Sequence, residues 1–256
     1  MLSLHRARRW GPATLLLAAV LPAAALAQEA EDVTPWMEMA LVGVDPGQVD
    51  EFLAAQRELA SLEQKAGVPW RSVSRTAAFG DTYRFLIVKP LAQFARLDRP
   101  GRPDPARVPV ESRIRRTVTS RQTFALRTTP DIDNPLPDGR DPALMLVQLV
   151  SVVPGRERDY IRVMAEEVLP HFKEANMHHS SGALTLGGDS GYVHFFHLGN
   201  FAALDQGSPM ARALGPEGAL EVTSKLAGVL ARTEQWVVRH LPDLSFRQQE
   251  EAESKN

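Results

Sequence analysis

An internal repeat is the feature that most constrains how this chain can fold. The stretch GDTYRFLIVKPLAQFARLD at 80–98 returns, with one deletion, as GDSGYVHFFHLGNFAALD at 188–205. At the same spacing, VDPGQVDEFLAAQ at 44–56 corresponds to VVPGRERDYIRVM at 152–164. Similarity with such small gaps, extending over most of each half, indicates an internal duplication.

Both copies predict the same order of elements. The short apolar runs WMEMALVGV and LMLVQLVSV are typical of strands buried on both faces. Each is followed by Pro-Gly and by a segment with apolar residues at helical spacing. Gly-Asp pairs at 80–81 and 188–189 then predict the turn of a β-hairpin, and a second helical region and a last strand close the copy. The order β-α-β-β-α-β is that of a ferredoxin-like unit.

The chain begins with a predicted export signal. A basic start precedes an apolar run too short to span a bilayer, and Ala25-Leu26-Ala27 fits the small-x-small cleavage pattern. A segment rich in proline and aspartate separates the two copies, and a charged stretch ends the chain. We therefore expect a signal peptide at 1–27, a first ferredoxin-like repeat at 28–127, a linker at 128–142, a second repeat at 143–246 and a disordered tail at 247–256.

Charge and composition narrow the possible partners. The formal net charge of −2 becomes −5 when Arg6, Arg8 and Arg9 are removed with the signal. A net negative charge does not favour binding to the phosphate backbone, so we do not expect a nucleic-acid partner. It has no cysteine, which excludes a lipoprotein anchor, a disulfide and a thiolate metal site. We expect a periplasmic or secreted protein without an integral membrane segment after signal cleavage.

The tandem repeat resembles the dimeric α+β barrel superfamily over residues 36–246. This superfamily includes the antibiotic-biosynthesis-type monooxygenases, the NIPSNAP-like and EthD-like proteins and, more distantly, the haem-binding chlorite dismutase and dye-decolorizing peroxidase groups. The resemblance implies an α+β fold in which the two ferredoxin-like units pack sheet to sheet as an intramolecular pseudo-dimeric barrel. It also implies a ligand pocket either between the helices and a sheet or within the barrel.

The histidines of the mature chain all lie in the second copy. On a helical wheel His171 shares the apolar side with Tyr160 and Met164, as does its aligned partner Glu63 in the first copy. This predicts that His171 lines a pocket, with exposure at a helix end beyond Pro170 as the alternative. The six histidines are 171, 178, 179, 194, 197 and 240.

In the strand GYVHFFHLG, alternation places Tyr192, His194 and Phe196 on one face and His197 on the other. The aligned residue of His194 is the apolar Leu86, and that of His197 is Lys89 at a strand end. A buried histidine at position 194 suits a general base or an axial ligand, while a core histidine bonded to a backbone carbonyl is the alternative.

Two classes of function remain open on these residues. In the first, the protein binds a small hydrophobic or aromatic molecule in the second repeat, and oxygenation without a cofactor or an isomerase-type proton transfer is the reaction that the resemblance implies. Haem binding is a variant of this class, and the sequence shows neither a metal-ligand spacing nor a phosphate loop. In the second, it is a non-catalytic binding or assembly module, with a homo-oligomer as a possible partner. The candidate residues are His194 and His171 for catalysis, and Tyr192, Phe196, Met164 and Tyr160 for ligand binding.

Overall fold

The computed structural model of the chain describes residues 36–91, 94–98, 104–137 and 141–248. The expected signal peptide lies outside the described residues, as do the expected cleavage site and the last eight residues of the expected tail. Among the residues that are described, no helix is both long and apolar enough to cross a membrane.

Each repeat contains four strands with helices between them. The first consists of β1 (Trp36–Val44), α1 (Val49–Lys65), β2 (Trp70–Thr76), β3 (Arg84–Leu91), α2 (Ala95–Asp98), α3 (Arg107–Thr117) and β4 (Val118–Thr128). The second consists of β5 (Leu144–Val152), α4 (Glu157–Val163), a π-helical turn (Met164–Val168), α5 (Leu169–Glu174), β6 (His179–Leu186), β7 (Gly191–Leu198), α6 (Pro209–Lys225) and β8 (Leu230–His240). A short β9 (Phe246–Arg247) follows. The predicted order of elements is confirmed in both copies.

The eight strands of the two repeats form a closed antiparallel barrel. Within the first repeat the strand order is β4-β1-β3-β2, and within the second it is β8-β5-β7-β6. Pairing of β4 with β6 and of β2 with β8 joins the two sheets at both edges, so the ring has no free edge. The α+β fold and the intramolecular pseudo-dimer expected from the sequence are thereby observed.

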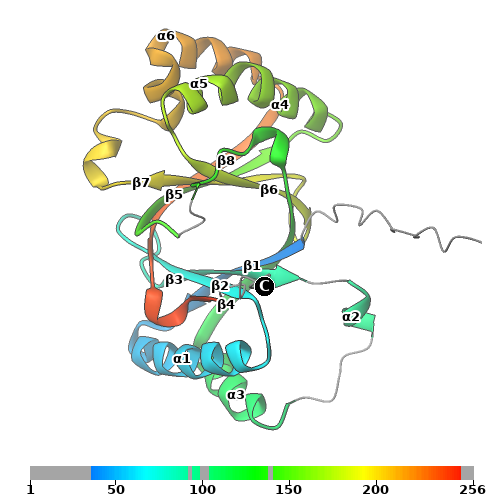
Figure 1. The fold of residues 1–256 in the computed structure, drawn as a ribbon, viewed down its shortest axis with the longest axis vertical. Coiled ribbons are helices and arrows are strands. Elements are labelled where there is room, and N and C mark those ends of the chain that lie inside the picture. Colours follow the sequence, from blue (N-terminus) through cyan, green and yellow to red (C-terminus); the bar gives the residue numbers. More distant parts are fainter. Residues whose placement is uncertain (1–35, 92–93, 99–103, 138–140, 249–256) are drawn as a thin grey trace, which may run out of the picture. The chain divides into compact units, whose positions relative to one another are not determined.

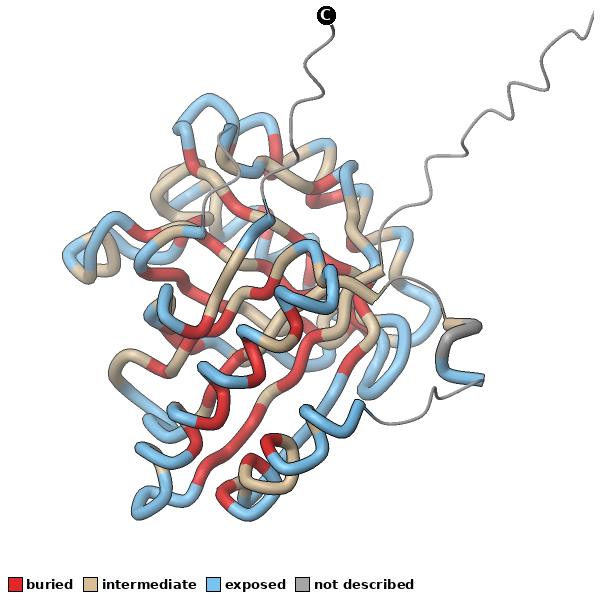
Figure 2. Tube along the Cα trace, turned by 60° about the horizontal axis from the view of Figure 1, so that its bottom comes forward, coloured by how far each residue is buried: buried red, intermediate tan, exposed pale blue. Residues whose placement is uncertain are grey.

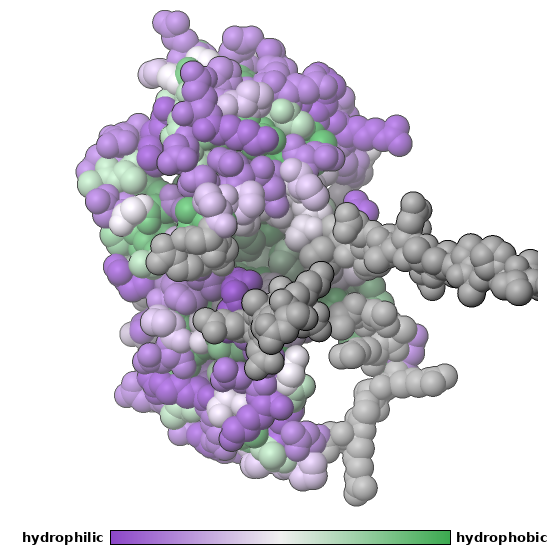
Figure 3. All heavy atoms as spheres, viewed as in Figure 1, coloured by the Kyte–Doolittle hydropathy of each residue, from purple (hydrophilic) through white to green (hydrophobic). Residues whose placement is uncertain are grey.

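Three apolar clusters correspond to the layers of this arrangement. The helices lie outside the barrel, α1 and α3 against the first sheet and α4 to α6 against the second (Figure 1). Buried residues run along the strands and on one side of each long helix (Figure 2). On the face shown in Figure 3, hydrophilic side chains cover both helical layers and apolar ones gather between them. The cluster inside the barrel contains side chains of strands alone, from both repeats: Met39, Leu86, Phe124, Leu126, Met145, Val147, Val193, Trp236 and Val238.

The strand register corrects the predicted counterparts of two histidines. Leu41 and Leu149 hold equivalent positions on β1 and β5, and they pair with Leu86 and Val193 respectively. The structural counterpart of His194 is therefore Ile87, and Pro90, not Lys89, corresponds to His197. The cause is the hairpin, which in the second repeat has one residue fewer between its paired strands, so an alignment anchored on the Gly-Asp turn is one residue out of register along β7.

The structure also overturns the prediction that His171 faces inward. The π-helical turn inserts one residue between α4 and α5, which rotates every later side chain by about 100° relative to a regular α-helix. Phe172 is buried in the position that Glu63 holds in the first repeat, and the side chain of His171 is 49% exposed. Both helices end alike, with Val68 donating to the carbonyl of Glu63 and Met177 to that of Phe172.

The segments outside the repeats also pack onto the barrel. In the linker, Ile132 is buried in the second helical core, and Asn134 pairs through its backbone with His179. At the other end of the chain, Arg247 pairs with Trp70 on β2. Arg247, expected to start a disordered tail, is thus part of the folded structure, because the edge of β2 beyond its pairing with β8 accepts a further strand.

Candidate functional site

A buried chain of hydrogen bonds centres on His194. Its Nε2 lies 2.7 Å from the hydroxyl of Tyr160 on α4, and its Nδ1 lies 2.8 Å from the hydroxyl of Ser181 on β6. The Ser181 hydroxyl donates in turn to the carbonyl of Ile132 at 3.4 Å. Because that hydroxyl has one proton to give, it accepts from Nδ1–H, which leaves Nε2 to accept from Tyr160.

Burial keeps the side chains of His194 and Tyr160 in this hydrogen-bonded chain neutral. His194 has no exposed surface, and its burial, with a smaller effect of neighbouring His179, lowers the pKa of His194 to about 3. Burial likewise raises the pKa of the Tyr160 hydroxyl. An imidazole that is neutral at ordinary pH, with both nitrogens hydrogen-bonded and no path to solvent, connects side chains and does not take protons from a ligand.

A small cavity lies between the second sheet and its helices. Its volume is about 190 Å³, below the range of about 300–1,000 Å³ usual for ligand pockets. Three of the four predicted ligand-binding residues line it: Tyr160, Met164 and Phe196. Tyr192 stacks on Tyr160 with ring centroids 4.8 Å apart and is not part of the lining.

The two predicted catalytic histidines lie apart. His171 lines a shallow groove on the outer face of the helices, together with Glu167 and Glu221. Its Nδ1 is 3.9 Å from the carboxylate of Glu174 one turn later. His194 and His171 therefore do not share a cavity, whereas His194, Tyr160 and Tyr192 do come together.

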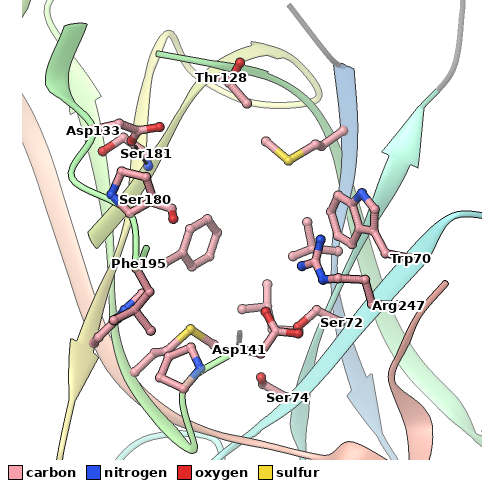
Figure 4. Close-up of a pocket in the computed structure, with 18 residues that line it drawn as sticks. Trp70, Ser72, Ser74, Thr128, Asp133, Asp141, Ser180, Ser181, Phe195 and Arg247 are labelled. Atoms are coloured by element: carbon pink, nitrogen blue, oxygen red, sulfur yellow. Dashed lines mark hydrogen bonds between the residues drawn. The ribbon is translucent and has the colours of Figure 1, made fainter. Parts of the chain in front are cut away.

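A second apolar cavity, larger than the one between the second sheet and its helices, opens at one end of the barrel, between the two repeats (Figure 4). Its volume is about 350 Å³, which suits a small-molecule ligand. In Figure 4, Trp70 and Arg247 lie on one side of it, and Phe195 and Asp133 on the other. Its apolar walls come from the barrel interior: Met37, Leu86, Val88, Met145 and Phe195.

A few polar groups converge on this barrel cavity. Asp133, from the linker, accepts a hydrogen bond from the backbone N–H of Ser181, and burial raises the pKa of its carboxyl to about 6. Arg247 lies over the ring of Trp70, with its guanidinium carbon 5.6 Å from the ring centroid. His197 and Asp141 also belong to the polar lining. The rest of it consists of short hydroxyl side chains: Ser72, Ser74, Thr128, Ser180 and Ser181.

Sequence reasoning missed most of this cavity. Trp70, Ser72 and Ser74 belong to β2 of the first repeat, where no candidate was expected, and Arg247 falls in the expected tail. Only the closure of the barrel brings them to the linker residue Asp133. The expectation that a pocket of this superfamily lies between helices and sheet or within the barrel was the single available signal.

Comparison with known proteins places the fold. No family model matches the sequence, and no curated protein is significantly similar to it. A protein provisionally named a monooxygenase, from Fusobacterium nucleatum, superposes with a TM-score of 0.58 at 10% identity, covering 84% of this chain and 99% of that one. The fold is that of the dimeric α+β barrel superfamily. Two further proteins of this fold are similar: a provisionally named monooxygenase from Lactobacillus acidophilus (TM-score 0.56, 12% identity, 84% of this chain and 97% of that one) and an anthrone oxidase-like protein (TM-score 0.56, 9% identity, 82% and 92%).

Haem, which some groups of this superfamily bind, does not fit the second-repeat site. An axial ligand needs a histidine nitrogen that faces a cavity. No histidine is among the described residues lining the second-repeat cavity, and both nitrogens of His194 are hydrogen-bonded. His171 lies in a groove lined by two glutamates, which lacks the enclosing apolar walls of a haem pocket. Nor do the described residues contain a group of three or more histidine or carboxylate side chains placed to hold a metal ion.

Proposed function

We propose that the protein binds a small, mostly apolar molecule in the barrel cavity, and that it does so after export. The observation that carries the proposal is the cavity itself, of about 350 Å³, with apolar walls from both repeats and a small set of polar groups around it. Such a combination is the usual form of a ligand site. The basic start, apolar run and small-x-small pattern of residues 1–27 support the export part of the proposal.

The lining supports a ligand with one flat apolar portion and a hydrogen-bonding end. Trp70 and Phe195 provide aromatic surfaces on opposite sides of the cavity (Figure 4). Asp133 and the neighbouring serines provide hydrogen-bonding groups beside one of these surfaces. A neutral aromatic molecule of one or two rings with a hydroxyl or carbonyl group matches both the volume and these contacts.

The proposal assigns binding and no reaction. Oxygenation or proton transfer, which the resemblance implies, would need a base that reaches the ligand. His194, buried and bonded at both nitrogens, does not supply one. The Asp133 carboxyl does line the barrel cavity, where it accepts from the backbone N–H of Ser181, and the proposal uses it as a hydrogen-bonding group for the ligand. Binding is therefore the function that the geometry supports best.

Titration with 1-naphthol, a neutral two-ring aromatic, tests the proposal. Binding is expected to quench the part of the tryptophan fluorescence that comes from Trp70 in the cavity, and isothermal calorimetry should give a matching dissociation constant. Val88→Phe places a ring in the cavity and should weaken binding by about tenfold or more, since the ligand loses most of the space it would occupy.

The matched control is Val108→Phe, because Val108 is an exposed valine on α3, away from the cavity. It should bind the probe like the wild type. Absence of saturable binding in the wild type, or equal binding by the two phenylalanine variants, would overturn the proposal. Circular dichroism confirms that each variant is folded.

A further inference from the structure

We propose that the first repeat has a second ligand site, a cavity between its sheet and its helices that binds a small organic dianion. This charged cavity has a volume of about 300 Å³ and lies among α1, α3 and the first sheet. It holds the position in the first repeat that the apolar cavity around Tyr160 and Met164 holds in the second. The inference is independent of the ligand proposed for the barrel cavity.

The duplication shows that this cavity has changed its character. Register and helix ends make Arg71 the counterpart of His179, Lys89 that of Phe196 and Glu63 that of Phe172. In the second repeat these three positions form an aromatic cluster, with the rings of Phe172 and Phe196 5.2 Å and 5.1 Å from that of His179. In the first repeat the same three positions carry charges that contact one another.

The charges of the cavity do not balance. Five cationic side chains and three carboxylates line it, which leaves a formal excess of two positive charges. Glu63, buried at its centre, is approached by Arg71 and, at its Oε1, by Lys89 at 3.4 Å and Arg107 at 3.6 Å. Burial alone would raise the pKa of Glu63, but these three cations together lower it, so the carboxylate stays ionised. Lys89 and Arg107 have second carboxylate partners, in Glu38 at 3.9 Å and Glu111 at 3.1 Å. The formal excess of two positive charges therefore belongs to the exposed Arg115 and Arg121 at the rim of the cavity.

The cavity also contains buried donor atoms that the described residues leave without an acceptor. The residue Arg71 is only 2% exposed, and its Nε has no hydrogen-bond partner among the described residues. The Nε of Arg107 is buried without a partner in the same way. Buried donors without acceptors and like charges close together both destabilise a fold. An anion in the cavity would relieve both.

Leu59, Ile87 and Ile114 add an apolar wall to the charged lining. A cavity with space beyond a single ion, an apolar wall and two excess positive charges suits a molecule with two anionic groups on a short carbon frame. Carboxylates and phosphates share the required chemistry, since guanidinium groups bind both with paired hydrogen bonds. We therefore commit to a small dianion bearing carboxylate or phosphate groups.

Calorimetric titration of the mature chain at low ionic strength tests the inference with three probes: succinate, inorganic phosphate and succinamide. Succinamide has the carbon frame of succinate without charge, so it should not bind. Succinate should bind saturably. Binding of phosphate as well would support a site for dianions in general, and succinate binding alone would support an organic dicarboxylate.

Two variants remove cations from the rim of the cavity, and one removes a matched cation elsewhere. Lys89→Met and Arg107→Met should each weaken succinate binding by about tenfold or more, because each deletes a charge-assisted contact. Both side chains are partly exposed, at 26% and 30%, so their loss should leave the fold intact. Arg113→Met is the control: Arg113 lies on the same helix and contacts Glu51 and Glu58 outside the cavity.

Failure to bind either anion would overturn the inference, as would binding that both rim variants leave unchanged. The result is separable from the barrel-cavity proposal, because 1-naphthol binding should be the same in all three variants. If a rim variant loses naphthol binding as well as succinate binding, it has lost its structure. Arg121→Gln then decides, because Arg121 lies on the exposed rim of the same cavity. Unchanged succinate binding by Arg121→Gln would reject the site.

Discussion

At the scale of single residues, the duplication provides an internal reference for each side chain of the second repeat. The rings of Phe52 and Phe85 lie 4.7 Å apart, tilted by 49°, in the first repeat, and those of Tyr160 and Tyr192 stack at 4.8 Å in the equivalent position of the second. What the second repeat adds is a hydroxyl on Tyr160 and an imidazole at His194. The pair replaces an apolar contact with a hydrogen-bonded one in the same space.

This substitution predicts a specific pH dependence of stability. In the unfolded chain His194 binds a proton near its ordinary pKa of 6.5, whereas in the folded protein burial lowers that pKa to about 3. Between these values the unfolded state binds the extra proton, so His194 makes the fold less stable as the pH falls through this window. The double variant Tyr160→Phe/His194→Ile, which recreates the side chains of the first repeat, has no such penalty.

Below pH 6.5 the wild type should therefore lose about 1.4 kcal/mol of unfolding free energy per pH unit relative to the double variant, which amounts to about 2 kcal/mol at pH 5. Urea denaturation across this range measures it. Asp133 and His179, which also titrate abnormally, are present in both proteins and cancel. Tyr192→Phe is the control and should give a curve parallel to that of the wild type; parallel curves for the double variant would contradict the pKa of His194.

Alternation along β7 was enough to predict which residues share a face with His194. It was not enough to predict the partner of His194 in the first repeat, because the two hairpins differ in length by one residue and the Gly-Asp turns hide the difference. Sequence similarity is strongest at the turns, while hydrogen bonding between strands decides the register. The apolar nature of the counterpart was right, and its identity was wrong.

At the scale of elements, the π-helical turn decides which side of the second helix meets the sheet. The extra residue is offset before the next strand: seven residues separate Glu63 from Arg71, and six separate their counterparts Phe172 and His179, so β2 and β6 return to the original alignment. An insertion that a nearby deletion cancels leaves no trace in the spacing of the repeat. This is why a wheel drawn at a constant angle placed His171, and not Phe172, on the buried side.

The turn leads to opposite expectations for two neighbouring residues. Phe172→Ala should lower the free energy of unfolding by about 3–5 kcal/mol, because it leaves a cavity beside His179 and Phe196 in the apolar cluster between the second sheet and its helices. His171→Ala should change it by less than about 0.5 kcal/mol, as is usual for exposed positions. Equilibrium denaturation of both variants checks this, and the reverse ranking would mean that the helix is regular.

At the scale of the whole molecule, the closed barrel couples the two repeats. Their shared interior contains side chains of both sheets, and neither sheet has its interior face covered without the other. The sequence predicted the repeats, their element order and their pairing as a pseudo-dimer. It could not predict the barrel cavity, because Trp70, Asp133 and Arg247 come from a strand, a linker and the end of the chain, and only closure brings them together.

Shared burial predicts that the two repeats unfold together. Trp36 and Trp70 report on the first repeat and Trp236 on the second. The double variant Trp36→Phe/Trp70→Phe and the variant Trp236→Phe therefore leave fluorescence from opposite halves. Their urea transitions should each coincide with the transition followed by circular dichroism of the same variant. Two separated transitions would show that each repeat is stable without the other's interior face.

The placement of Arg247 has a consequence for the order in which the protein can mature. Its partner Trp70 belongs to the first repeat, while Arg247 follows the second repeat in the chain. The helical layer of the first repeat can therefore form from residues that precede the linker, but the wall of the barrel cavity needs the segment after β8. A chain cut between β8 and β9 would have both repeats and lack one side of the cavity proposed to bind a ligand.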